Sequence, residues 1–199
     1  WKAEVEEAGA YSGDFVMTPT AERIIRALNR ARESRGGVAS VDENETQERG
    51  IALVYGASSV GKSTVSDWYL NKQGTNRQMG QWPVVVVRCT GNERSRQELH
   101  KAILASMDGA VFYPQKHEKP IDTIRSRIPD GGIIIFDEAQ LLSPRRLDEL
   151  RYFPDRCGIA LAFMGNLTGY KELVDKKIGQ IMSRVGGSRV VVDLPTEGD

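Results

Sequence analysis

Residues 51–64 of this 199-residue chain read IALVYGASSVGKST. The stretch begins with a short apolar run, which predicts a buried strand, and then breaks into small residues. Gly56, Gly61, Lys62 and Ser63 occupy the fixed positions of the pattern G-x-x-x-x-G-K-[ST]. The residues from Lys62 onward predict a helix. Strand, glycine-rich loop and helix in this order predict a phosphate-binding loop.

Phosphate chemistry explains the residue types in this loop. Glycine at positions 56 and 61 lets the backbone turn tightly, so that successive N–H groups point inward, and the following helix directs the positive end of its dipole to the same place. We expect Lys62 to reach the β- and γ-phosphates of ATP and the Ser63 hydroxyl to bind Mg²⁺. A glycine-rich turn that matches by chance is the alternative. The predicted nucleotide-binding residues of the loop are Gly56, Ala57, Ser58, Ser59, Val60, Gly61, Lys62, Ser63 and Thr64.

Composition limits the classes of protein to consider. Lys plus Arg and Asp plus Glu both number 27, so no overall charge draws the chain to nucleic acid or membranes. The two cysteines, Cys89 and Cys157, lie far apart, which disfavours a disulfide framework or a zinc site and favours a reducing compartment. No apolar run is long enough to span a bilayer, and residues 1–14 lack the pattern of a signal peptide. We expect a cytoplasmic protein with no membrane partner.

Apolar runs alternate with amphipathic segments along the rest of the chain. Further strands are predicted at 83–88, 132–136, 158–164 and 189–192, and helices at about 18–35, 95–107, 120–128, 144–153, 168–175 and 178–185. Four consecutive valines in the first of these strands are typical of a strand covered on both faces. The alternation predicts an α/β fold with a parallel sheet. We expect one ATPase core over residues 15–193, a flexible segment at 1–14 and a tail at 194–199.

Two acidic residues, Asp137 and Glu138, follow the apolar run GIIIF. Because parallel strands end at the edge of the sheet where ligands bind, both carboxylates are expected near the phosphate loop. Asp137 is suited to hold Mg²⁺, and Glu138 to polarise a water for in-line attack on the γ-phosphate. A water-activating glutamate favours ATP hydrolysis over transfer of phosphate to a small molecule.

Polar residues near the last two predicted strands could complete the site. Asn166 follows the fourth strand, where its amide could orient the attacking water; a turn asparagine is the alternative. Arg184 and Arg189 lie just before and at the last strand. One of them could reach a neighbouring subunit's nucleotide as an arginine finger, worth ~10³–10⁵ in rate, and Arg184 is preferred. A surface arginine is the alternative.

Four segments together, GASSVGKST, IIIFDEAQLL, FMGN and MSRVGGSR, resemble the AAA+ ATPases that select target DNA for transposition. The resemblance covers about residues 15–192, and the segment FVMTPTAERI resembles one that lies near the adenine in that family. No match is found to the helical lid that follows the last strand in such proteins, or to the helix-turn-helix domain upstream of their core. A lid is therefore expected to be absent.

The resemblance implies a five-stranded AAA+ core with strand order 5-1-4-3-2. It implies ATP and Mg²⁺ as ligands, self-assembly into a helical filament or ring around DNA, and recruitment or activation of a transposase. Glu138 would then activate water, Asn166 would be the first sensor and Arg184 the finger.

Two loops face the central channel in assemblies of this type, and here they correspond to residues 90–96 and 141–146. Arg145 and Arg146 fall in the first turn of a predicted helix, where the dipole disfavours positive charge by ~0.3–1 kcal/mol each. Contact with DNA phosphates would explain them, and pairing with Asp148 and Glu149 is the alternative. No residue suggests base reading, so binding should be sequence-independent. The predicted DNA contacts are Asn92, Arg94, Arg96, Arg145 and Arg146.

Two other functions stay open. The first is an ATP-switched adaptor, such as a helicase loader or signalling NTPase, that does not bind DNA directly; the zero net charge favours it slightly. The second is a metabolic P-loop kinase, against which Glu138 and Asn166 argue.

Overall fold

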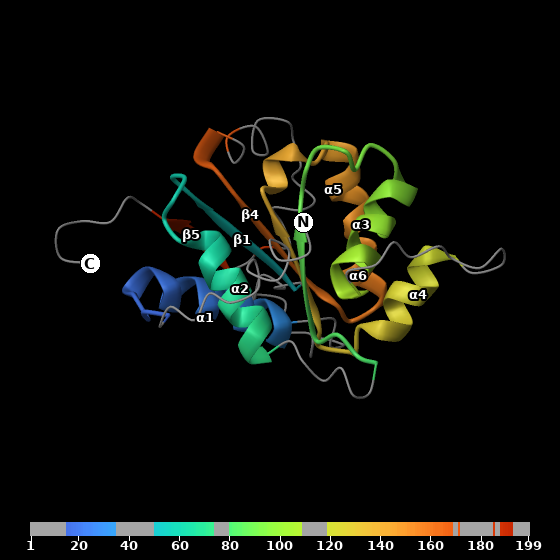
Figure 1. Cartoon of the computed structure of the whole chain (residues 1–199), viewed down its shortest axis with the longest axis horizontal. Coiled ribbons are helices and arrows are strands. Elements are labelled where there is room, and N and C mark those ends of the chain that lie inside the picture. The colour runs from blue at the N-terminus through green and yellow to red at the C-terminus, as the bar shows by residue number, and fades with distance from the viewer. Residues whose placement is uncertain are drawn as a thin grey trace, which may run out of the picture.

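A parallel sheet forms the centre of the computed structural model, which describes residues 15–34, 50–73, 80–108, 119–168, 171, 185 and 188–192 (Figure 1). Its strands run in the order β2-β3-β4-β1-β5, which confirms the predicted α/β fold and strand order. Their bounds are β1 Ile51–Gly56, β2 Val84–Arg88, β3 Ile133–Asp137, β4 Ala160–Gly165 and β5 Arg189–Val192.

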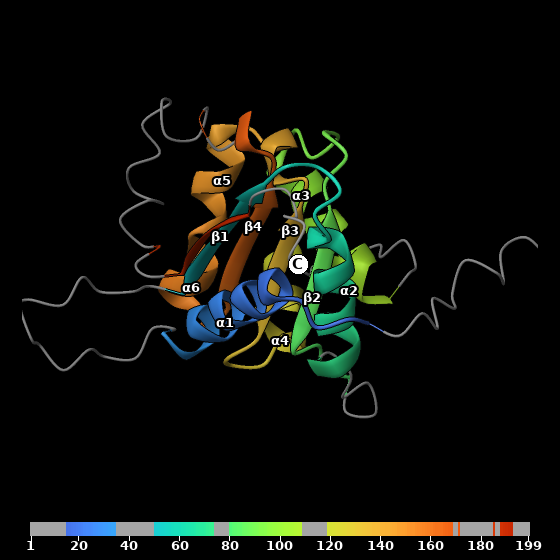
Figure 2. The same ribbon diagram turned by 90° about the vertical axis from the view of Figure 1, so that its left-hand side faces the viewer.

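Helices cover both faces of this sheet (Figure 2). The first face carries α1 and α2, and the second carries α3 to α6. Since both faces are covered, every residue of β1, β3 and β4 is buried. The helices are α1 Pro19–Glu33, α2 Lys62–Gln73, α3 Arg96–Asp108, α4 Pro120–Arg127, the 3-10 helix η3 Ala139–Leu141, α5 Pro144–Leu150 and α6 Tyr152–Arg156.

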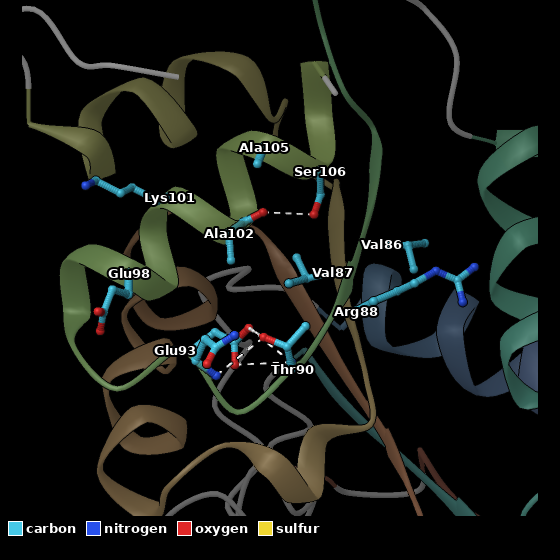
Figure 3. A pocket seen from close by; sticks show the side chains of 11 residues that line it. Val86, Val87, Arg88, Thr90, Glu93, Glu98, Lys101, Ala102, Ala105 and Ser106 are labelled. Carbon is cyan, nitrogen blue, oxygen red and sulfur yellow. Dashed lines mark hydrogen bonds between the residues drawn. The ribbon is translucent and has the colours of Figure 1, made fainter. Parts of the chain in front are cut away.

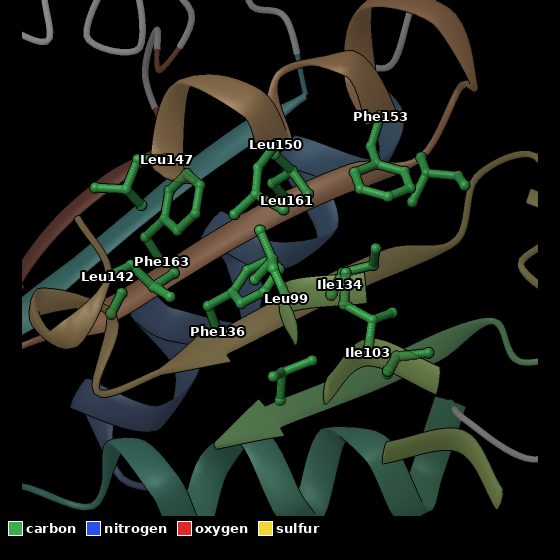
Figure 4. Close-up of a cluster of buried hydrophobic side chains, with 14 of the residues drawn as sticks. Leu99, Ile103, Ile134, Phe136, Leu142, Leu147, Leu150, Phe153, Leu161 and Phe163 are labelled. Carbon is green, nitrogen blue, oxygen red and sulfur yellow. The ribbon is translucent and has the colours of Figure 1, made fainter. Parts of the chain in front are cut away.

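The larger hydrophobic core lies between the sheet and helices α3 to α6 (Figure 4). Phe136 of β3 and Phe163 of β4 stack there with ring centroids 5.7 Å apart. Leu147, Leu150 and Phe153 pack over them from α5 and α6. This packing holds the two strand ends that carry Asp137 and Asn166 in fixed relative positions.

The prediction of one continuous helix at 144–153 was wrong, because the structure has two helices there. Helix α5 ends at Leu150 and α6 begins at Tyr152. Pro154 explains the break, because a proline ring clashes with the carbonyl four residues earlier, here that of Leu150. The predicted helices at 168–175 and 178–185 and the segments 1–14 and 194–199 lie wholly or almost wholly outside the described residues. No helix in the described ranges has the length and apolarity that a membrane span requires.

Candidate nucleotide-binding site

Sheet register gathers the predicted site at the carboxyl edge of the sheet. Strand β4 is hydrogen-bonded between β1 and β3, and Tyr55 of β1 lies opposite Gly165 of β4. The phosphate loop after β1, Asp137 at the end of β3 and Asn166 after β4 therefore leave the sheet side by side. This is the edge at which open α/β sheets bind ligands.

The phosphate loop turns through two left-handed residues. Ser59 has φ 65° and Gly61 has φ 84°, a conformation that glycine adopts without strain. The first residue of α2 is Lys62, and its Nζ donates hydrogen bonds to the carbonyl oxygens of Ala57 at 2.6 Å and Gly56 at 3.2 Å. The ammonium group therefore lies inside the loop, where a phosphate would be held.

Gly56 is required for close packing rather than for an unusual turn. A Cβ at this position would lie 2.2 Å from the carbonyl oxygen and 2.8 Å from the Cβ of Val192 on β5. Gly56 ends β1 directly opposite Val192 in the register. The predicted role in turning the backbone thus belongs to Gly61 and Ser59.

We expect Gly56→Ala to lower the free energy of unfolding by about 1–3 kcal/mol, because backbone atoms must move to admit the methyl group. Gly61→Ala is the matched control, since a Cβ there meets nothing within 4 Å and adds only left-handed strain, about 1–2 kcal/mol. Thermal unfolding of both nucleotide-free variants checks this. A Gly56→Ala variant as stable as the parent chain would contradict the packing role.

The charge on Lys62 is only partly compensated by the protein. Its side chain is buried, and burial lowers the pKa of Lys62, while the carboxylates of Glu138 and Asp137 act in the opposite direction. A buried cation of this kind favours an anionic partner. The phosphates of a nucleotide are the partner that the surrounding loop N–H groups can also bind.

Ser63 and Asp137 meet directly. The Ser63 Oγ donates to Asp137 Oδ2 at 2.6 Å, and Asp137 is almost fully buried. A hydroxyl and a carboxylate in contact form a hard-oxygen donor set that fits Mg²⁺, which proteins commonly hold with one or two side chains and substrate phosphates. No group of three or more His, Cys, Asp or Glu that could hold a metal occurs in the described ranges.

Glu138 stands at the rim of the site in a left-handed conformation, with φ 57° and ψ 39°. Such a conformation costs a non-glycine residue about 1–3 kcal/mol and persists where the surroundings enforce it. Here the Glu138 N–H donates to Asp137 Oδ1 at 3.1 Å, and Gln140 Nε2 donates to Glu138 Oε2. The Glu138 carboxylate is exposed, so water can reach it.

Comparison with known proteins identifies the family. The sequence profile of the AAA domain family matches residues 42–173, more than half of the chain. The chain belongs to this family. A comparison with curated proteins gives no match.

Two solved structures of the Aeropyrum pernix ORC2 protein share the fold of this AAA domain. The structure of its ADPNP-ADP complexes is 16% identical with a TM-score of 0.53, and that of its ADP form is 14% identical with a TM-score of 0.54. Each comparison covers 90% of this chain and 50% of the ORC2 chain, so the chain spans about half the length of those proteins. This likeness shows the AAA+ fold, and the family membership supports a general AAA+ NTPase function.

Two residues of the site in this AAA domain were missed by sequence reasoning. Gln140 contacts Glu138, and its Oε1 is buried without a hydrogen-bond partner among the described residues. Arg88 ends β2 opposite Asp137; its Nη2 donates to both Asp67 carboxylate oxygens at 2.8 and 2.7 Å, and its Nη1 lies 3.9 Å from Asp137 Oδ2. The predicted adjacency of the second and third strands could have indicated Arg88, because it places their ends together.

The structure places the other predicted catalytic residues differently relative to the site. Asn166 follows β4 at the site edge and is half-buried. Arg184 lies outside the described residues. Arg189 is the exposed first residue of β5, at the opposite end of that strand from Val192 and the phosphate loop. The preference for Arg184 as the finger stays a prediction.

The predicted DNA contacts lie in two places. Asn92 and Arg94 are exposed in the loop after β2, which is shaped by the buried carboxylate of Glu93 through hydrogen bonds from the Thr90 hydroxyl and the N–H groups of Thr90 and Gly91. The other three are Arg96, Arg145 and Arg146.

These three arginines gather around Glu149 of α5. The alternative of pairing with acidic residues had named Arg145 and Arg146 but not Arg96. Asp148 instead pairs with Arg151 at 2.7 Å. Arg146 is buried, whereas Arg96 and Arg145 are exposed, so of these three predicted DNA contacts two are on the surface.

A hollow of about 560 Å³ lies between the edge strand β2 and helix α3 (Figure 3). Valine and alanine side chains form part of its wall, and Arg88, Glu98 and Lys101 stand around it. None of the predicted phosphate-loop residues lines it. The nucleotide site is therefore assigned from the chemistry of the loop and not from this hollow.

Proposed function

We propose that this AAA+ protein binds and hydrolyses ATP at the carboxyl edge of its sheet and uses ATP to control sequence-independent DNA binding. In this role it would select target DNA and recruit or activate a transposase. The proposal of nucleotide binding rests on the contact between Ser63 and Asp137, next to the enclosed Lys62. This contact joins the phosphate loop to the acidic end of strand β3.

Each side chain of the site has a role that fits its surroundings. Lys62 would bind the β- and γ-phosphates, exchanging its loop carbonyl partners for phosphate oxygens. Ser63 and Asp137 would hold Mg²⁺, which neutralises phosphate charge when bound. Glu138, reachable by water, would accept a proton from the attacking water, and Asn166 would orient that water. The ORC2 structures with ADPNP and ADP support an adenine nucleotide as the ligand.

Assembly is the second part of the proposal. An arginine finger supplied by a neighbour, for which Arg184 is the candidate, would make turnover depend on self-association into a filament or ring. The exposed arginines near the start of α3 and in α5 support DNA as a partner, since phosphate contacts by arginine need no base reading.

DNA binding should be measured by fluorescence anisotropy with ATP, with ADP and without nucleotide, over a range of salt concentrations. We expect binding that requires ATP, weakens with salt and is indifferent to DNA sequence. Arg96→Ala and Arg145→Ala should each reduce the slope of log affinity against log salt by about 1. Arg26→Ala is the control, because Arg26 is equally exposed but lies on α1, over the other face of the sheet.

Failure to bind DNA in every nucleotide state, in a sample that binds ATP, would contradict the DNA part of the proposal. The chain would then act as an ATP-switched adaptor, the function that its zero net charge favours.

A further inference from the structure

Three arginines from two neighbouring helices, α3 and α5, share one carboxylate (Figure 1). Arg96 Nη2 lies 3.6 Å and Arg145 Nε lies 3.7 Å from the same atom, Glu149 Oε1. Arg146 Nη1 lies 2.8 Å from the other oxygen, Glu149 Oε2. We call these four residues the arginine cluster.

The arginine cluster has an inner pair, formed by the buried Arg146 and the partly buried Glu149, and an exposed outer pair. The side chains of Arg146 and Glu149 are 6% and 16% exposed, whereas those of Arg96 and Arg145 are 66% and 83% exposed. The buried His100 lies beside them; burial lowers its pKa, as do Arg96 and Arg146, while Glu149 acts in the opposite direction, so its surroundings favour the neutral imidazole. The cluster therefore carries three positive charges and one negative charge.

Within the cluster, Arg146 makes the closest ion pair with Glu149. A buried arginine needs a close anion, and Arg146 takes the shortest contact in the cluster. The outer arginines, Arg96 and Arg145, both contact the other carboxylate oxygen, Glu149 Oε1, at longer distances. Arg96 and Arg145 are themselves open to solvent, which screens their pairs with Glu149, so they can exchange Glu149 for another anion at little cost.

We propose that Glu149 is an internal counter-ion that competes with DNA phosphates for Arg96 and Arg145 and thereby limits the DNA affinity of this AAA+ protein. The proposal rests on the proposed function. Glu149 holds the two guanidinium groups near one point while each keeps most of its five N–H donors for a phosphate. Removing the negative charge would leave the outer arginines without this competitor and raise the local positive potential.

Neutralisation by Glu149→Gln tests the proposal with fluorescently labelled duplex DNA and the full chain bound to a non-hydrolysable ATP analogue. We expect DNA affinity to rise about 3- to 10-fold at low salt, with a salt slope steeper by up to about one phosphate contact. Asp148→Asn is the matched control. It changes the net charge equally, one residue away, but Asp148 pairs with Arg151 outside the cluster. The change in log DNA affinity caused by Asp148→Asn should be less than half of the change caused by Glu149→Gln.

A second variant guards against misfolding, because Glu149→Gln leaves Arg146 buried without its anion. Arg146→Met combined with Glu149→Gln removes both charges of the inner pair, leaves the net charge unchanged and spares a buried unpaired cation. It should also bind DNA more tightly than the parent chain, because Glu149 no longer competes for Arg96 and Arg145, while the positive charge that is lost belongs to the buried Arg146. Thermal unfolding confirms that each variant is folded.

The DNA affinities of the parent chain and the variants together decide whether Glu149 acts as a counter-ion. Tighter binding by the Glu149 variants, beyond that of Asp148→Asn, supports the counter-ion role even if the parent chain binds DNA weakly. A parent chain that binds DNA while folded Glu149 variants bind no better than Asp148→Asn overturns the counter-ion role alone. Absence of DNA binding in all of these proteins overturns the DNA part of the proposed function as well. If the Glu149 variants bound poly-glutamic acid more tightly than the parent chain does, but not DNA, the arginine cluster would be a binding site for an acidic protein. This result would also overturn the proposal.

Discussion

Glu138→Gln is expected to lower kcat for ATP hydrolysis about 10²–10⁴-fold, the usual contribution of a positioned general base, and to leave ATP affinity nearly unchanged. The amide keeps the shape of the side chain and its contact with Gln140, but it cannot accept a proton from water. Glu138 is also exposed and is not part of the Ser63–Asp137 contact, so the binding half of the site stays intact. Steady-state phosphate release in the presence of DNA, together with the Kd for a fluorescent ATP analogue, measures both quantities.

Glu22→Gln serves as the control for this experiment, because it neutralises an exposed carboxylate on α1 whose partner is Arg26. Its turnover should equal that of the parent chain. Equal turnover by Glu138→Gln would remove Glu138 from the mechanism, and a parallel loss of ATP affinity would show that its role is in binding.

Lys62→Ala is expected to weaken ATP binding about 10- to 150-fold, which corresponds to the ~1.5–3 kcal/mol of a hydrogen bond to a charged group, and to abolish measurable turnover. The nucleotide-free variant should nevertheless be at least as stable as the parent chain. Burial lowers the pKa of Lys62, so its protonation opposes folding. This unfavourable contribution is fully present below the folded-state pKa and disappears as pH rises to the unfolded-state pKa.

Thermal unfolding without nucleotide and equilibrium titration with ATP separate the two effects of Lys62→Ala. A variant that binds ATP as the parent chain does would show that the Lys62 ammonium is not directed at phosphate. A large loss of stability without nucleotide would instead mean that its hydrogen bonds to Ala57 and Gly56 support the fold.

Most of the sheet could be predicted from the sequence because its strands are unusually easy to recognise. Residues 51–55 and 133–136 are buried on both faces of the sheet and are continuously apolar up to the functional residues Gly56 and Asp137 that follow. The order of the strands came from the resemblance to AAA+ proteins, and the register then brought the phosphate loop and Asp137 together. Local pattern and family likeness together thus predicted the candidate nucleotide site.

Contacts between side chains of different elements were harder to predict. Nothing in the local pattern shows that Arg96 approaches Glu149 across two helices, or that Arg88 stands between Asp67 and Asp137. The reason for Gly56 was also wrong, because its close neighbour Val192 lies far along the sequence. The break before Pro154, by contrast, follows from a local rule and could have been predicted.

Calorimetric titration of the parent chain with ATP tests whether Lys62, Ser63 and Asp137 form an ATP–Mg²⁺ site. The titration should be run once with Mg²⁺ and once with a chelator. We predict one ATP bound per chain, with tighter binding when Mg²⁺ is present, because Ser63 and Asp137 supply its protein ligands. No heat of binding at millimolar ATP, or an affinity that does not depend on Mg²⁺, would contradict this assignment.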